Sequence, residues 1–203
     1  PNDVKTESDS ILLVNMDSGQ TVYEKDADSK RYPASTTKIM TYIIAVENIA
    51  DLDNTKIPIK QSVLDVLKNT GSSLANVENH VGKSMTAIDL LYSMMVPSGN
   101  DAAMVLADYI GEGNVDNFVK LMNEKAKELG LQNATFTNAS GLTKNGQDNK
   151  MSTRDIFTLS KAIIEKYPEV LEYAKTTVLE QPSRNFKKES TIPLVGQVEG
   201  VDG

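Results

Sequence analysis

The sequence has no cysteine and no tryptophan, and His80 is its single histidine. Without cysteine there can be no thiolate nucleophile, no CxxC redox pair and no cysteine-ligated zinc site. A serine–histidine–acid triad would have to use His80, which lies in the polar stretch NVENHVGK. We interpret His80 as a surface or loop residue, so triad chemistry is disfavoured.

The chain also lacks a basic run and a long apolar run. Lysine and arginine number 21 against 28 aspartate and glutamate residues, which gives a formal net charge of −7. Basic residues are not interleaved with aromatic ones, so we expect no nucleic-acid partner. No apolar stretch is long enough to cross a bilayer. The 203 residues, 39% of them hydrophobic, are sufficient to bury a core.

The start of the chain predicts a hairpin followed by a helix. Two short apolar-rich runs, SILLVNM and QTVYEKD, flank the turn sequence DSG, in which Gly19 can adopt a positive φ. From about Thr36 to Ile49, apolar residues recur at helical spacing with few polar residues between them. This segment is therefore expected to form a buried helix.

Further helices are predicted by capping signals. Thr86 and Asp89 open TAIDLLYSMMV, DAAMVLADYIG follows a short break, and NVDNFVKLMNEKAKELG ends on Gly130. Ser152 and Asp155 open STRDIFTLSKAIIEKY. Its expected apolar stripe consists of Ile156, Leu159, Ile163 and Ile164. A mostly helical body thus follows the early hairpin.

The stretch RYPASTTKIM places Lys38 three residues after Ser35, in the expected first turn of the buried helix. Side chains at this spacing share a helix face and can meet. The residues four positions before and after Lys38 are Ala34 and Tyr42, so no carboxylate pairs with it along the helix. Desolvation should then lower the pKa of Lys38, and its neutral amine could accept the Ser35 hydroxyl proton.

A second motif, VPSGNDAA, sets Ser98, Gly99 and Asn100 in the break between two apolar helices. Either motif alone has an ordinary explanation. An SxxK pair also describes a capping serine followed by a lysine that reaches solvent, and Asn100 or Asp101 could simply cap the next helix. Their combination favours a shared cleft containing a nucleophile, an amine and an amide.

With these motifs in place, the chain resembles the serine D-alanyl-D-alanine carboxypeptidases, the low-molecular-mass penicillin-binding proteins of peptidase S11 type. The resemblance extends over ILLVNMDSGQTVYEKDAD, RYPASTTKIMT, TAIDLLYSMMVPSGNDAAMVLADYIG, FVKLMNEKAKELGLQNATFTNASGL and MSTRDIFTLSKAII. It implies an α+β fold of the β-lactamase and DD-peptidase type, in which helices flank an antiparallel sheet beside a helical lobe. Residues 1–203 would form one catalytic domain of the transpeptidase type.

The resemblance also implies a role for each motif residue. Ser35 would attack the peptide carbonyl between two D-alanines, with Lys38 as its general base and its own backbone N–H as half of an oxyanion hole. Ser98 would relay a proton to the leaving amine, and Asn100 would hold Lys38 and contact the substrate amide. Gly99 is expected in the substrate-binding loop, where it permits a close approach. No metal or other cofactor is implied.

The implied partners are peptidoglycan stem peptides ending in D-Ala-D-Ala and, as covalent inhibitors, β-lactam antibiotics. The resemblance further implies an extracytoplasmic enzyme. It would be secreted, or attached to the outer face of the bacterial cytoplasmic membrane through a region that this sequence does not contain, and its signal peptide would likewise lie outside this sequence.

The sequence departs from the family pattern in two places. The third family motif, KTG, is absent, and no K[ST]G occurs in the chain. The terminal VEGVDG resembles the run that precedes the KTG strand, so we expect that strand, and those after it, to lie beyond Gly203. Residues 1–203 alone would then lack the second oxyanion donor and be inactive. The second departure is Lys150, where the family often has histidine.

Two alternatives remain open at this point. A class A β-lactamase needs a glutamate that activates the deacylating water. The nearest candidate, Glu128, lies at an expected helix end, the following loop TNASGLTKNGQDNK has no glutamate, and Gly99 stands where that class carries aspartate. The absent KTG instead motivates a noncatalytic, penicillin-recognising scaffold, against which the retained Ser35 and Lys38 argue.

Overall fold

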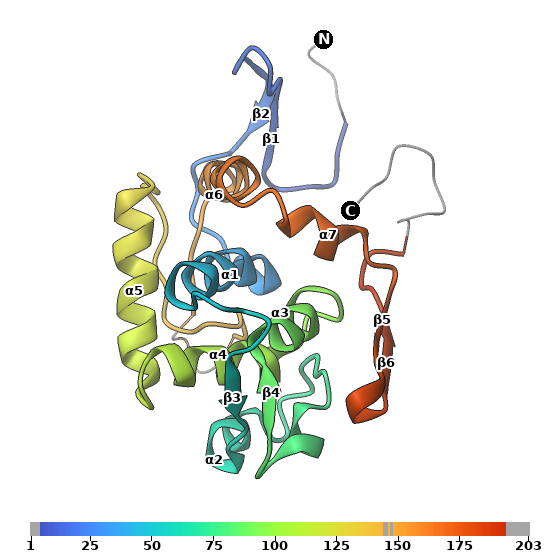
Figure 1. Ribbon diagram of the computed structural model, residues 1–203. Helices are drawn as coiled ribbons and strands as arrows, with labels where there is room; N and C mark the ends of the chain where they lie inside the picture. Colours follow the sequence, from blue (N-terminus) through green and yellow to red (C-terminus); the bar gives the residue numbers. More distant parts are fainter. Residues whose placement is uncertain (1–4, 144–145, 147, 194–203) are drawn as a thin grey trace.

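The computed structural model describes residues 5–143, 146 and 148–193 (Figure 1). The terminal VEGVDG run, expected to precede a strand, lies outside these residues. The strands are β1 (Ile11–Val14), β2 (Thr21–Lys25), β3 (Lys56–Pro58), β4 (Ser84–Thr86), β5 (Val178–Gln181) and β6 (Phe186–Glu189). The α-helices are α1 (Thr37–Asn48), α2 (Gln61–Leu64), α3 (Ala87–Met95), α4 (Asn100–Ile110), α5 (Val115–Glu128), α6 (Thr153–Lys166) and α7 (Val170–Lys175).

The α+β class is confirmed, with short antiparallel strand pairs beside a mostly helical body. The expected antiparallel sheet is present, within the described part of the chain, as three separate strand pairs: β1 with β2, β3 with β4, and β5 with β6. The first pair is the predicted hairpin, in which Ile11 faces Lys25 and Gly19 has φ of +69°. A two-stranded sheet is marginal alone, so each pair depends on the helices it contacts.

Helix α1 forms the centre of the core and packs against α3, α4, α5 and α6 (Figure 1). Met40, Tyr42 and Ile44 are each at most 2% exposed. A helix that is apolar around most of its circumference has to be covered on several sides. The predicted buried helix is thus confirmed, but it begins at Thr37. Ser35 was expected in its first turn and lies instead in the preceding 3-10 turn, Ala34–Thr36.

Helices α3 and α4 pack against each other and are separated by the break at residues 96–99. The Thr86 hydroxyl caps α3 by accepting the backbone N–H of Asp89 at 3.3 Å. Ser98 has φ of +58°, a left-handed conformation that is uncommon for a residue with a side chain. This corner turns the chain directly into α4, at whose start Asn100 lies.

The predicted C-terminus of α5 and the predicted N-terminus of α6 are confirmed. Gly130 follows α5 with φ of +73°, and Ser152 and Asp155 form a reciprocal capping box at the start of α6. The predicted apolar stripe of α6 is wrong at one residue, because Ile164 is 41% exposed whereas Leu159 and Ile163 are buried. Ile164 lies about 100° further round the helix than Ile163, which turns it away from the core.

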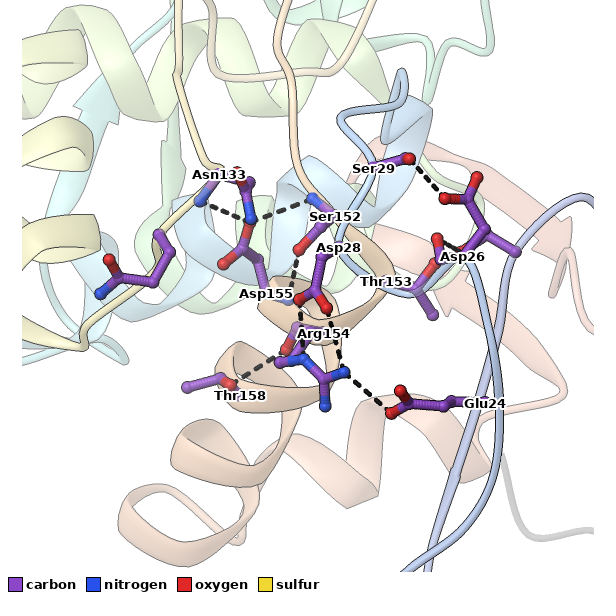
Figure 2. A network of polar contacts seen from close by, with 12 residues as sticks. Glu24, Asp26, Asp28, Ser29, Asn133, Ser152, Thr153, Arg154, Asp155 and Thr158 are labelled. Carbon is purple, nitrogen blue, oxygen red and sulfur yellow. Dashed lines mark hydrogen bonds and ion pairs between the residues drawn. The ribbon is translucent and has the colours of Figure 1, made fainter.

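A polar network joins the β1–β2 hairpin to the start of α6 (Figure 2). The guanidinium of Arg154 pairs with Asp28 at 2.7 Å and with Glu24 at 2.9 Å. Its backbone N–H donates to the carbonyl of Ala27 at 3.0 Å. These contacts hold the hairpin over α6. Within the described residues, no helix has the length and apolar character needed to cross a membrane.

Candidate active site

Ser35 lies exposed at the 3-10 turn that leads into α1. Its hydroxyl oxygen accepts a hydrogen bond from Lys38 Nζ at 3.2 Å and another from Ser98 Oγ at 2.9 Å. The preceding residue, Ala34, has φ of +47°, so the backbone immediately before Ser35 is in the left-handed region. Such strain persists when surrounding contacts fix the chain, and it often accompanies functional sites.

Lys38 is 3% exposed and lies one turn deeper on α1. Its ammonium group donates to Asn100 Oδ1 at 2.6 Å and to the carbonyl of Ser140 at 2.8 Å, in addition to Ser35. Burial lowers the pKa of Lys38 to about 8, against the opposing charge of Asp101. The predicted lowering is therefore confirmed. The sequence suggested Asp101 only as a helix cap, and its electrostatic effect on Lys38 becomes apparent only in the structure.

The four predicted side chains thus meet, although Ser98 and Asn100 lie far from Ser35 in the sequence. Gly99 faces inward. Its N–H donates to the carbonyl of Ser93 at 3.1 Å, and a Cβ there would lie 2.5 Å from the same oxygen. Close packing alone therefore requires glycine at this position. A part for Gly99 in substrate binding stays a prediction.

The carbonyl of Ser140 is a site group that the sequence motifs did not identify. Its loop is built on two amide side chains. Asn138 Oδ1 accepts the backbone N–H groups of Ser140 at 3.1 Å and Gly141 at 2.7 Å. Asn149 Oδ1 accepts those of Thr137 and Asn138, while its Nδ2 donates to Thr37 on α1 at 3.0 Å. The sequence NASGL carries the signal, a turn-forming asparagine followed by glycine.

Gly141 closes this loop against the nucleophile turn. It has φ of +82°, and a Cβ there would lie 1.8 Å from the carbonyl oxygen of Ala34. Both the backbone conformation and the contact therefore demand glycine. The position of Ser35 is coupled in this way to the loop that presents the Ser140 carbonyl to Lys38.

The other residues considered from sequence lie apart from this set. His80 is half-buried in a 3-10 turn, and its Nδ1 has no hydrogen-bond partner within the described part of the chain. Glu128 ends α5, where it pairs with Lys125 at 2.6 Å. Lys150 Nζ lies 3.2 Å from the centre of the Tyr32 ring, beside the nucleophile turn. Among the described residues, no cluster of three or more metal-ligating side chains was found.

Comparison with known proteins identifies the family of the chain. The family model of peptidase S11, D-alanyl-D-alanine carboxypeptidase, matches residues 1–203. The chain is 33% identical over 200 residues to D-alanyl-D-alanine carboxypeptidase DacF of Bacillus subtilis, covering 97% of this chain and 50% of the relative. To DacC of Escherichia coli it is 35% identical over 185 residues, covering 86% of this chain and 45% of the relative.

A solved structure, penicillin-binding protein D2 of Listeria monocytogenes in its cefotaxime-bound form, superposes with a TM-score of 0.84. The identity is 28%, and the match covers all of this chain and 80% of that one. The chain spans about half the length of the two curated relatives. Because the family model matches the whole chain, this protein belongs to the S11 peptidase family of D-alanyl-D-alanine carboxypeptidases.

Proposed function

We propose that the protein containing this chain is a serine D-alanyl-D-alanine carboxypeptidase that acts through an acyl-enzyme on Ser35. The contact that carries the proposal is the hydrogen bond between Ser35 Oγ and the buried amine of Lys38, at 3.2 Å. A nucleophile within reach of a base whose pKa is near neutrality is the arrangement that covalent acyl transfer requires. Family membership supplies the class of reaction.

In the proposed acylation, neutral Lys38 accepts the Ser35 proton as Oγ attacks the carbonyl carbon between the two D-alanines. A C–O bond forms and the carbonyl oxygen becomes an oxyanion near the Ser35 N–H. The C–N bond then breaks as Ser98, which already bonds Ser35 at 2.9 Å, donates its hydroxyl proton to the leaving amine of D-alanine and takes up the proton that Lys38 had accepted, so that Lys38 is neutral again. Attack by water on the ester releases the shortened peptide and restores Ser35.

Asn100 and the Ser140 carbonyl hold Lys38 between these steps. Both accept hydrogen bonds from Nζ, at 2.6 Å and 2.8 Å, so the amine points at Ser35 rather than at solvent. Neither acceptor carries a full charge. A carboxylate in direct contact would stabilise the ammonium form more, so these uncharged acceptors leave burial as the main influence on Lys38, and burial lowers its pKa to about 8.

The proposed substrate is a peptidoglycan stem peptide ending in D-Ala-D-Ala, and the proposed inhibitors are β-lactams. A β-lactam presents a strained carbonyl where the scissile peptide carbonyl would lie. The cefotaxime-bound Listeria relative supports this part of the proposal. A substrate in the cell wall would require the enzyme to act outside the cytoplasm, and membership of the carboxypeptidase family supports this part of the proposal.

The test uses the protein expressed from its whole reading frame and a fluorescent penicillin. We expect covalent label on Ser35, a long-lived acyl-enzyme, and release of free D-alanine from a D-alanyl-D-alanine peptide. Ser35→Ala should lose both reactions. A folded, unlabelled protein would favour the noncatalytic scaffold, whereas rapid turnover of penicillin would favour a β-lactamase.

A further inference from the structure

The Ser98–Asn100 corner lies between two walls. One wall is Ser93 on α3, whose carbonyl accepts the N–H of Gly99 at 3.1 Å. The other is the segment 73–77, in which the carbonyl of Ser73 accepts the N–H of Asn100 at 2.9 Å. A Cβ on Gly99 would meet both walls, at 2.5 Å from the Ser93 oxygen and 2.8 Å from Ala75 Cβ. The placement of the corner therefore depends on the separation of the two walls.

Asp101 fixes one of these walls to the corner itself. Its carboxylate is 3% exposed and accepts the backbone N–H groups of Ala75 at 2.8 Å and Val77 at 2.9 Å. Because Asp101 directly follows Asn100, these bonds attach the segment 73–77 to the first turn of α4. A buried carboxylate is costly to hold unless its oxygens are satisfied in this way.

Arg184 connects the two walls. It belongs to the 3-10 turn Pro182–Arg184, between β5 and β6, and is 9% exposed. One terminal nitrogen donates to the carbonyl of Ala75 at 2.8 Å, and the other donates to Ser93 Oγ at 3.1 Å. The planar fork of a guanidinium can hold both groups at once, which the single ammonium group of lysine cannot do in the same geometry.

We propose that Arg184 and Asp101 are positioning residues for the reaction, and that together they hold the Ser98–Asn100 corner against Lys38 and Ser35. The left-handed backbone of Ser98 is an unfavourable conformation that only surrounding contacts maintain. If the two walls were free to move relative to each other, Asn100 Oδ1 would move away from Lys38, and Ser98 Oγ would move away from Ser35. The catalytic consequence rests on the function proposed above; the positioning itself does not.

The charges around the pair also bear on Lys38. The negative charge of Asp101 raises the pKa of Lys38 and so opposes the lowering caused by burial. The same carboxylate also raises the pKa of Arg184 against the effect of burial. Asp101 also lines a cavity of about 210 Å³, whose charged lining residues include Lys68 and Glu78. A test must therefore separate a lost contact from a changed charge.

Arg184→Lys retains the positive charge and removes the fork, and Arg154→Lys is its matched control. Arg154 also makes a forked contact, with Glu24 and Asp28, but at the distant hairpin. Two quantities are measured in each folded variant of the full-length protein. One is the rate of acylation by fluorescent penicillin. The other is the titration of Lys38, followed by NMR of ¹³Cε-labelled lysine and assigned with Lys38→Arg.

We expect Arg184→Lys to slow acylation by roughly tenfold to a hundredfold, because small misplacements of reacting groups have effects of this size. The Lys38 titration should move to lower pH, since the ammonium form loses the Asn100 acceptor. Asp101→Asn should move it in the same direction through loss of the carboxylate charge alone, so the charge-conserving Arg184→Lys decides the question of position. Arg154→Lys should change neither quantity.

An unchanged acylation rate and Lys38 titration in folded Arg184→Lys would overturn the proposal. If the unsubstituted protein is not acylated, the proposed function fails, and the Lys38 titration still decides whether Arg184 positions the site. A shift of the Lys38 titration in Arg184→Lys that is missing in Arg154→Lys then supports positioning, and its absence rejects it.

Discussion

Lys38 makes the proposed chemistry dependent on pH. Its pKa is lowered to about 8, mainly by burial, so the amine is charged below that pH and neutral above it. Since only the neutral form can accept the Ser35 proton, the acylation rate should rise about tenfold per pH unit below pH 8 and level off above it. Stopped-flow labelling with fluorescent penicillin from pH 6 to 10 measures this profile.

A substitution at the same residue tests whether the proton transfer itself matters. Lys38→Arg keeps the charge but removes the ability to lose a proton, so acylation should fall by roughly 10²–10⁴-fold at every pH. Lys60→Arg, at a lysine paired with Asp108, is a suitable control and should keep the normal rate. Near-normal acylation of Lys38→Arg would remove Lys38 from the mechanism.

Gly141 packs directly against the backbone of the turn that carries Ser35. Gly141→Ala would place a methyl group 1.8 Å from the Ala34 carbonyl at a φ of +82°. We expect a loss of at least about 2 kcal/mol in the free energy of unfolding, together with a large loss of acylation. Gly130→Ala is the control, because its φ is +73° but nothing lies within 4 Å of the added Cβ.

The control should cost about 1 kcal/mol from backbone strain and leave acylation unchanged. Urea unfolding and penicillin labelling of both variants measure the two effects. Equal losses of stability in the two variants would show that the contact with Ala34 is relieved by movement of the loop, and that this loop does not constrain Ser35.

At the scale of single elements, the capping box of α6 offers a local test. Ser152→Ala removes the hydroxyl that accepts the Asp155 N–H at 3.1 Å, in a residue with no exposed surface. The expected loss in the free energy of unfolding is about 1–2 kcal/mol. Thr158→Ala, which removes a hydroxyl from the body of the same helix, should cost less than about 0.5 kcal/mol. Similar losses in urea unfolding would argue against a role for the cap.

Elements whose signals are local could be predicted from the sequence. The DSG turn, the Ser152–Asp155 cap and Gly130 each act within a few residues, and all three are found as predicted. Periodicity also located α1. It could not place the boundary between the 3-10 turn and α1, because Ser35 and Lys38 can meet in either arrangement. Nor could it show that Ile164 faces solvent, which depends on where neighbouring elements lie.

The site was predictable only as far as its motifs extended. Ser35, Lys38, Ser98 and Asn100 lie in two recognisable stretches, and hydrogen bonds join them in the structure. The Ser140 carbonyl is a backbone group, so its residue type carries no direct signal. In the sequence Asp101 has the pattern of a helix cap. Arg184 extends from the β5–β6 turn to the carbonyl of Ala75 and the hydroxyl of Ser93. Tertiary contacts such as these have no spacing rule in the sequence.

At the scale of the whole molecule, a few charged side chains connect segments far apart in the chain. Arg154 joins the hairpin to α6, and Arg184 joins the β5–β6 turn to α3. Glu47, near the end of α1, joins α5 and the end of α6. Because α1 also carries Lys38, the pairing of Glu47 with its neighbours bears on the stability of the framework around the site.

Glu47 should therefore contribute to the acid sensitivity of the fold. Partial burial opposes its ionisation, but hydrogen bonds from Lys125, Lys166 and Tyr167 outweigh that cost and lower its pKa to about 2. A carboxyl whose pKa is lower in the folded state stabilises the protein above its unfolded value of 4.5. That contribution is lost as the pH falls from about 4.5 to 2.

Glu47→Gln should accordingly lower the free energy of unfolding by about 1–3 kcal/mol at pH 7, and the difference from the unsubstituted protein should shrink towards pH 2. Asp51→Asn is the control. Asp51 is an exposed carboxyl that bonds Asn54 within its own turn, and its loss should have little effect at either pH. Urea unfolding at pH 7, 4 and 2.5 gives the comparison. If the free energies of unfolding of Glu47→Gln and the unsubstituted protein differ by the same amount at every pH, the charge of Glu47 does not stabilise the contact between α1, α5 and α6.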